Sequence, residues 1–142
     1  MVTLHFDGLC EPKNPGGIAC YGWLIRRGDR VLAQGKGVVA CGGPRATNNV
    51  AEYTALIKGL EAVVALDPDE VEVRGDSQLI IYQMAGQYAV RSWHLRPLWK
   101  RAQALVRRLR QVRFRWVPRE QNAEADALAW QAYRQAMAKR ER

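Results

Sequence analysis

The sequence has few of the residues that cross-link a chain or anchor it in a membrane. Its three cysteines are an odd number and none belongs to a C-x-x-C pair, so neither a disulfide framework nor a zinc site is indicated. No apolar run approaches the roughly eighteen residues that a membrane helix needs. The N-terminal residues begin with a strand-like alternation and show neither the charged region nor the cleavage site of a signal peptide. These absences favour a chain that acts in the cytoplasm without membrane contact.

Acidic residues are scarce relative to basic ones. The 14 aspartates and glutamates are outnumbered by 22 lysines and arginines, and the formal net charge is +8. Such a charge attracts polyanions, so nucleic acid is the first partner to consider. The length of 142 residues and the hydrophobic share of 48% are typical of one globular domain. We therefore expect a single domain over residues 1–142, and a monomer.

The segment Thr47–Leu66 has the spacing of a long helix whose buried face begins with a carboxylate. An apolar stripe runs along one side of this segment at intervals of three and four residues, and Glu52 is its first member. Moving an unpaired carboxylate out of water costs several kcal/mol. Glu52 must therefore be neutralised, hydrogen-bonded or bound to a cation.

Alternating and helical patterns divide the rest of the chain into strands and helices. Strands are predicted near residues 2–7, 19–27, 30–39, 70–75 and 112–116, and helices near 47–66, 77–85, 95–109 and 123–138. The first three strands are joined by short loops and form an antiparallel meander. The two later strands return through helices and so run parallel to the first. The predicted fold is α/β, with a five-stranded mixed sheet flanked by helices.

Four carboxylates are expected where these strands and helices meet. Asp7 and Asp76 each end a predicted strand, and Asp126 heads an apolar stripe of the last helix as Glu52 does in the central one. The carboxyl ends of parallel strands share one edge of a sheet, which is where ligands bind. If the four converge, each like-charged pair at about 4 Å costs on the order of 4 kcal/mol at an effective dielectric constant of about 20. Oxygen ligands select hard cations, so the pattern indicates a site for Mg²⁺ or Mn²⁺.

Short motifs in a fixed order give the chain a family resemblance. They are Phe6-Asp7-Gly8, Asn14-Pro15-Gly16-Gly17, Tyr21-Gly22, Thr47-Asn48-Asn49 with Ala51-Glu52, Gly75-Asp76-Ser77-Gln78, Trp116-Val117-Pro118, and Asn122 with Ala125-Asp126 and Leu128-Ala129. With these motifs the sequence resembles type 1 ribonuclease H over nearly its whole length. The resemblance implies the RNase H-like fold and hydrolysis of the RNA strand of an RNA–DNA hybrid. It also implies that two divalent ions bind at Asp7, Glu52, Asp76 and Asp126.

The same resemblance implies substrate contacts in the loops around these carboxylates. Residues suited to reading 2′-hydroxyls in the minor groove, or to lining the two strands, are Asn14, Asn48, Gln78, Cys10 and Asn49. A pocket for a phosphate of the DNA strand is implied at Arg45, Thr47 and Asn14. Phosphate contacts of this kind position the substrate and carry no base information.

Two departures from the family pattern are visible. The loop before the last helix lacks the histidine that the family often has there, which leaves Arg119 or Glu120 to assist the late step of the reaction. The segment Gln87–Trp99 is too short to hold the extra basic helix with which many members grip substrate. Trp93, with His94 and the arginines around it, is then the candidate to contact DNA. The alternative is that the Trp93 ring packs in the core.

Three functions from different classes fit the motifs. The first is a hybrid-specific endoribonuclease, the second is a nuclease or resolvase of the same fold that acts on DNA, and the third is a hybrid-binding module without catalysis. The asparagine and glutamine amides favour the first over the second, because DNA lacks the 2′-hydroxyl group. The intact set of carboxylates argues against the third.

Overall fold

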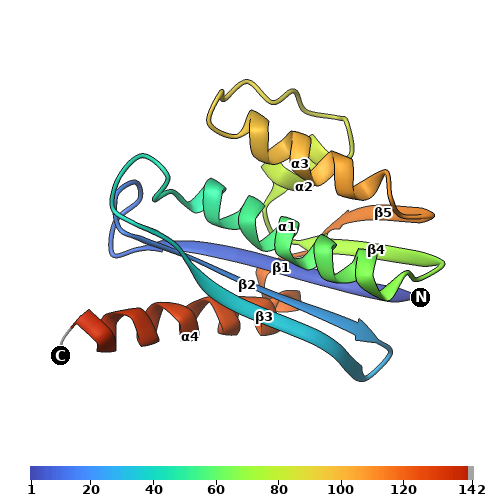
Figure 1. The fold of residues 1–142 in the computed structure, drawn as a ribbon, viewed down its shortest axis with the longest axis horizontal. Coiled ribbons are helices and arrows are strands. Elements are labelled where there is room, and N and C mark those ends of the chain that lie inside the picture. The colour runs from blue at the N-terminus through green and yellow to red at the C-terminus, as the bar shows by residue number, and fades with distance from the viewer. Residues whose placement is uncertain (141–142) are drawn as a thin grey trace.

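The chain folds in the predicted order of strands and helices (Figure 1). A computed structural model describes residues 1–140, and the last two residues of the predicted domain lie outside this range. The strands are β1 (Val2–Glu11), β2 (Ile18–Arg27), β3 (Arg30–Cys41), β4 (Glu70–Gly75) and β5 (Gln111–Trp116). The helices are α1 (Asn48–Leu66), α2 (Gln78–Met84), α3 (Arg96–Val106), a short 3₁₀ helix (Arg119–Gln121) and α4 (Ala123–Arg140). Within residues 1–140, no helix combines the length and apolar character needed to cross a membrane.

The sheet is mixed, as predicted. Its strand order is β3-β2-β1-β4-β5. The strands β1, β2 and β3 pair antiparallel as a meander, and β4 and β5 continue the sheet in parallel with β1. The central strand β1 therefore has an antiparallel neighbour on one side and a parallel neighbour on the other.

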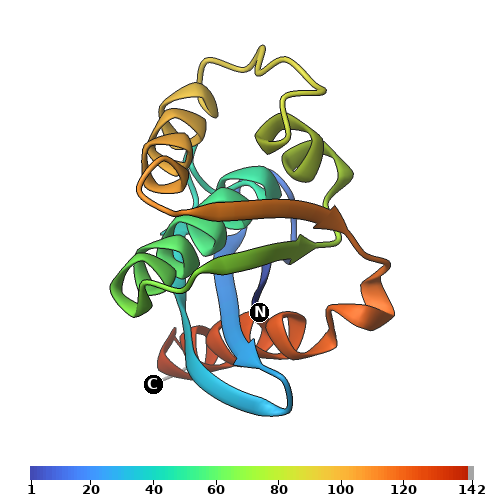
Figure 2. The ribbon, with the colours of Figure 1, turned by 90° about the vertical axis from the view of Figure 1, so that its right-hand side faces the viewer.

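Helices cover both faces of the sheet (Figure 2). Helix α1 lies across the meander and packs against α3, and the largest apolar cluster lies between these helices and the sheet. Helix α4 lies on the opposite face, where it contacts β1, β2 and β3. Because β1 is covered on both faces, its side chains Leu4, Phe6 and Leu9 are all buried.

The structure corrects the predicted position of Asp7 at the end of a strand. Strand β1 continues to Glu11 because β2 pairs with it along its whole length. Its pairing with β4 stops earlier, at His5 and Arg74. Asp7 therefore lies inside β1 but beyond the last residue that is paired with the parallel neighbour. In this register the Asp7 side chain lies level with Asp76, the residue that follows β4.

The third helix is shorter than predicted, since it ends at Val106 rather than near residue 109. Arg110 then forms ion pairs of 3.1 Å with Asp67 and 2.7 Å with Asp69. Exposed ion pairs of this kind each add little stability. They join the turn before β5 to the end of α1, and this turn occupies the residues that the prediction gave to the helix.

Substitution of Gly8 tests how closely β1 and α1 must approach. A Cβ atom at this position would overlap backbone atoms of Ala51 and Glu52, which cannot move aside as a flexible side chain can. Overpacking in a core typically costs about 1–3 kcal/mol. We expect Gly8→Ala to lower the free energy of unfolding by at least this amount and to displace Glu52. Urea unfolding measures the stability.

Gly59→Ala is the matched control, because Gly59 also lies where α1 meets β1. The nearest atoms that a Cβ there would meet belong to the flexible side chain of Leu4, and alanine is favoured over glycine within a helix by about 0.8–1 kcal/mol. We expect the smaller loss of stability in this variant. Equal losses in the two variants would contradict the idea that backbone contact at Gly8 sets the spacing.

Candidate metal centre

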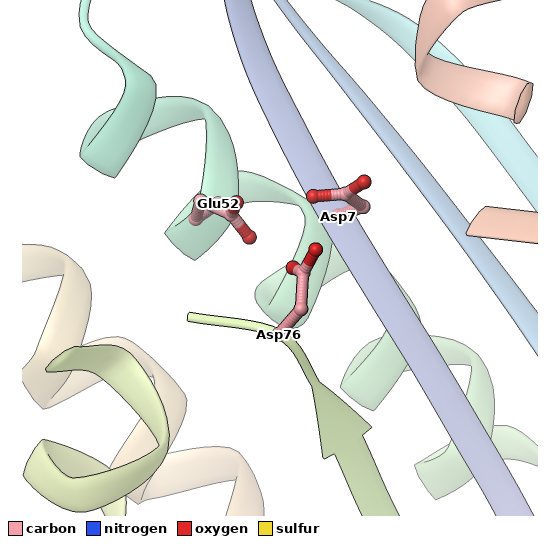
Figure 3. Close-up of side chains that lie close together, drawn as sticks. All are labelled: Asp7, Glu52 and Asp76. Atoms are coloured by element: carbon pink, nitrogen blue, oxygen red, sulfur yellow. The ribbon is translucent and has the colours of Figure 1, made fainter. Parts of the chain in front are cut away.

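Three carboxylates from separate elements meet beyond the end of β4. Asp7 comes from β1, Glu52 from α1, and Asp76 from the residue after β4. One oxygen of each lies within 4.8 Å of the others. Figure 3 shows the three side chains facing one another. The structure thus brings together three of the four carboxylates that the sequence singled out.

Local hydrogen bonds hold the strand and the helix that carry two of these residues. The backbone N–H of Gly8 donates to Asp7 Oδ1 at 2.9 Å. Glu52 lies in the second turn of α1, and Thr47 caps this helix by accepting a hydrogen bond from the N–H three residues further on. The main chain therefore holds the Asp7 carboxylate, and the cap holds the start of the helix that carries Glu52.

Burial and mutual repulsion favour the protonated forms of these side chains. Burial and the charge of Asp76 raise the pKa of Asp7 to about 8. Burial, followed by the charge of Asp7, also raises the pKa of Glu52. Burial raises the pKa of Asp76 as well, although hydrogen bonding from Asn122 and the charge of Arg119 oppose this rise. The cluster is a poor place for three negative charges without a cation.

One oxygen of the cluster lacks a partner among the described residues. Glu52 is 4% exposed, and its buried Oε2 atom accepts no hydrogen bond from residues 1–140. Such an atom is costly to bury. A divalent cation would contact it and offset the repulsion among the carboxylates. The all-oxygen donor set suits a hard ion such as Mg²⁺ or Mn²⁺, so the residues present fit the predicted metal.

Asp126, the fourth predicted carboxylate, lies at the wall of the same cavity. It comes from the first turn of α4 and does not belong to the group of oxygens within 4.8 Å. After burial and the charge of Asp76, contact with Asp126 further raises the pKa of Asp7. The structure therefore places Asp126 beside the cluster.

A cavity of about 610 Å³ surrounds the carboxylates and extends along the N-terminus of α1. Three of the predicted substrate contacts, Cys10, Asn14 and Asn48, line it. Asn14 Oδ1 accepts a hydrogen bond of 3.0 Å from the backbone N–H of Asn48, which ties the β1–β2 loop to the start of α1. The Cys10 thiol lies 3.2 Å from the carbonyl oxygens of Lys13 and Ala46, so its hydrogen-bonding partners are main-chain groups of the protein itself.

The other predicted substrate contacts lie outside this cavity. Thr47 and Asn49 line a second cavity of about 580 Å³ between α1, α2 and the segment before α3. Arg45 and Trp93 line a third cavity of about 370 Å³. Gln78 is exposed at the first position of α2 and lines none of the three. The predicted contacts therefore surround the N-terminus of α1 and do not form one pocket.

Trp93 lies at the surface, so the alternative that its ring packs in the core is wrong. It is 74% exposed, and its ring stacks on that of His94 with 3.8 Å between the centroids. Exposed aromatic rings provide stacking platforms for nucleic-acid bases. Its position therefore suits the predicted contact with DNA.

Comparison with known proteins agrees with this geometry. The sequence model of a family described as "Reverse transcriptase-like" matches residues 5–132. A protein named ribonuclease H from Thiobacillus denitrificans is 30% identical over 151 residues, an alignment that covers 96% of this chain and 95% of that protein. The chain belongs to the ribonuclease H family. Its RNase H-like fold, predicted from the sequence, is thereby confirmed.

Two further members show how far the likeness extends within the ribonuclease H family. The bifunctional protein Rv2228c of Mycobacterium tuberculosis is 43% identical over 130 residues, which cover 90% of this chain and 34% of that protein. This chain thus spans about a third of the mycobacterial protein. The solved structure of LC11-RNase H1 in complex with RNA/DNA hybrid has a TM-score of 0.87 at 34% identity, and the match covers 96% of this chain and 99% of that one.

The chain has an arginine beside its carboxylates, in the loop before α4. Arg119 begins the 3₁₀ helix and lines the carboxylate cavity. Its charge acts on Asp76, where it opposes the rise in pKa that burial causes. Glu120 is exposed and does not line that cavity. Of the two residues proposed to stand in for a histidine, only Arg119 is placed at the site.

Three side chains at the site had no role assigned from the sequence. The indole N–H of Trp116 donates to the Asp76 carbonyl at 3.1 Å, and Trp130 lines the carboxylate cavity one helical turn beyond Asp126. Asn122 is 1% exposed and contacts Phe6 of β1 and Asp76, the residue after β4. The helical spacing from Asp126 to Trp130 was a usable signal. Asn122 gave no signal beyond its place in a family motif, because an asparagine before a helix is usually an exposed cap.

The raised pKa values predict that the metal-free protein loses stability as the pH rises. The ordinary pKa of an aspartate is 3.8, whereas Asp7 in the folded protein has a pKa of about 8. Its contribution to stability is fully present below the lower value and is lost as the pH rises through the higher one. In EDTA at pH 8 we expect Asp7→Asn to melt several degrees above the unsubstituted protein. The difference should shrink as the pH falls toward 4.

Asp29→Asn is the control for this comparison, since Asp29 is exposed in the turn between β2 and β3. It should melt like the unsubstituted protein at both pH values. An Asp7→Asn protein that melts lower at pH 8 would show that the Asp7 carboxylate stabilises the metal-free fold and does not strain it.

Proposed function

We propose that this chain is a metal-dependent endonuclease that hydrolyses the RNA strand of RNA–DNA hybrids. The observation that carries the proposal is the buried cluster of Asp7, Glu52 and Asp76, in which one Glu52 oxygen has no partner among residues 1–140. Asn14 and Asn48 line the same cavity. The related LC11-RNase H1, solved with an RNA/DNA hybrid, supports the choice of substrate.

The acidic side chains are the candidate ligands of two divalent ions, Mg²⁺ or Mn²⁺. Asp7, Glu52 and Asp76 offer oxygens from three elements, and Asp126 adds a carboxylate at the cavity wall. When bound, such a pair of ions activates a water molecule for attack on phosphorus and stabilises the charge on the leaving oxygen. The part played by the protein is to hold these carboxylates in place and to align the scissile phosphate with them. The mechanism needs no side-chain nucleophile.

The hybrid is proposed to lie across the N-terminus of α1, with its two strands on different sides of that helix end. Asn14 and Asn48, beside the carboxylates, suit the 2′-hydroxyl groups of the RNA strand. Arg45 and Trp93 line the cavity on the other side and suit a phosphate and a stacked ring of the DNA strand. One helix end then aligns both strands, with Thr47 as its cap.

Cleavage of three end-labelled duplexes tests this proposal. RNA–DNA hybrid, duplex DNA and duplex RNA are each incubated with Mg²⁺, Mn²⁺ or EDTA. We expect cuts in the RNA strand of the hybrid alone, with either metal and not in EDTA. Equal cleavage of duplex DNA would favour a nuclease or resolvase that acts on DNA, and binding of the hybrid without any cleavage would indicate a silent module.

Asp76→Asn is the variant that assigns this activity to the carboxylates. The substitution keeps the shape of the side chain but removes charge that a cation needs, so hydrolysis should fall below about a tenth of its original rate while the hybrid still binds. Asp69→Asn is the matched control, because Asp69 is exposed and pairs only with Arg110 among the described residues. If Asp76→Asn cleaves as well as Asp69→Asn, the assignment fails.

Arg119 is expected to act through its charge. A guanidinium stays protonated at neutral pH and cannot serve as a general base, but it holds phosphate oxygens well. We expect Arg119→Ala to lower kcat by about ten- to a hundredfold, roughly 1.4–2.7 kcal/mol, with little change in KM. The shape of the pH–rate profile should persist, because the substitution removes no group that titrates near neutrality.

Arg108→Ala removes an equal charge from an exposed position in the turn between α3 and β5 and serves as the control. Full turnover of Arg119→Ala at saturating hybrid would show that Arg119 is only a surface residue. A profile that loses a limb near neutral pH would instead point to a histidine. His5 contacts Asn122 beside Asp76, whereas His94 lines only the second and third cavities, so His5 is the nearer candidate.

A further inference from the structure

We infer that Asn122 is a positioning residue that joins the three elements carrying Asp7, Asp76 and Asp126. Asn122 Nδ2 donates to the carbonyl oxygen of Phe6 at 2.9 Å and lies 3.5 Å from Asp76 Oδ1. Its main-chain carbonyl accepts a hydrogen bond of 3.1 Å from the Asp126 N–H. One buried residue therefore contacts β1 next to Asp7, the carboxylate after β4, and the first turn of α4.

The orientation of the Asn122 amide follows from its partners. The carbonyl of Phe6 is only an acceptor, so the NH₂ group must face it. The amide oxygen then faces His5, whose Nδ1 atom lies 3.3 Å away. Because that oxygen only accepts, His5 must carry a proton on Nδ1 and donate it. A flipped Asn122 amide would set two oxygens against each other at Phe6, so His5 and Phe6 together determine which atom reaches Asp76.

This arrangement matters for Asp76 because its carboxylate is oriented by hydrogen bonds from its own main chain and from Asn122. Asp76 is only partly buried and follows the last residue of β4, so sheet pairing does not fix its rotamer. A hydrogen bond from Asn122 to one oxygen leaves the other lone pairs of the carboxylate for a cation. Groups that orient metal ligands in this way typically change metal affinity or activity by about 10- to 100-fold when they are removed. We expect an effect of this size for Asn122.

The experiment compares Asn122→Ala with Gln103→Leu. Gln103 also donates a hydrogen bond from its side-chain amide to a main-chain carbonyl, that of Met84. This bond joins α3 to α2 and lies away from the carboxylates. We expect Asn122→Ala to need about tenfold more Mg²⁺ or Mn²⁺ for half-maximal cleavage and to lower kcat by about 10- to 100-fold, with KM for the hybrid nearly unchanged. The rise in melting temperature on addition of Mn²⁺ should also shrink. Gln103→Leu should change none of these quantities.

Variants of His5 test the orientation of the amide. His5→Leu removes the donor and should reproduce part of the effect of Asn122→Ala. His5→Asn keeps an N–H group near the position of Nδ1 and should restore the Mn²⁺ response. If Asn122→Ala does not fold, Asn122→Ser, which retains a hydroxyl donor, and the two His5 variants carry the test.

The inference rests on the proposed function only for its kinetic readouts. If the unsubstituted protein cleaves no duplex, the proposed function fails, and the Mn²⁺-dependent melting shift alone decides the role of Asn122. Equal melting shifts in the unsubstituted protein and Asn122→Ala would overturn the inference. So would a loss of activity that follows the loss of stability equally in Asn122→Ala and Gln103→Leu.

Discussion

Mutual repulsion among Asp7, Glu52 and Asp76 is the constraint that the rest of the structure has to balance. Their oxygens lie within 4.8 Å of one another, and Asp7 and Glu52 are almost fully buried. No ordinary core would select such a group, since each carboxylate raises the cost of ionising the next. The apolar cluster between α1, α3 and the sheet supplies the stability that offsets this cost. The electrostatic repulsion is confined to the carboxyl end of β4 and the neighbouring part of β1. The apolar packing that offsets it lies along the rest of the sheet.

The position of the cluster follows from a difference in length between neighbouring strands. Strand β1 continues with β2 to Glu11, whereas its pairing with β4 stops at His5. Beyond that point one side of β1 is open, and Asp7 and Asp76 occupy the opening from either side. Helix α1 approaches closely enough to add Glu52 only because Gly8 has no side chain. The register of β1 with β4, the glycine at position 8 and the N-terminal turns of α1 together define the site.

The sequence predicted those features that depend on periodicity and missed those that depend on a particular contact. The stripe headed by Glu52 predicted both the helix and a buried carboxylate, because a misplaced charge stands out against apolar spacing. The alternation around Asp7 could not show that this residue lies inside a strand, since the end of a strand depends on which neighbouring strand continues to pair with it. Asn122 contacts residues more than 40 positions away, which no local pattern encodes. The exposure of Trp93 was undecided for a similar reason, because whether a ring at the edge of a helix is covered depends on the length of the loop beside it.

The raised pKa values of the carboxylates make metal binding depend on the release of protons. With a pKa of about 8, Asp7 holds a proton near neutral pH when no cation is bound, so a metal ion must displace protons in order to bind. Metal affinity should then rise with pH over the range in which the carboxylates ionise. The chain as a whole has the opposite charge, with a formal net value of +8, which suits the polyanionic substrate proposed for it. In the proposed function, an acidic centre in a basic chain separates two tasks: the basic residues attract the nucleic acid, and the carboxylates act once cations have offset their charge.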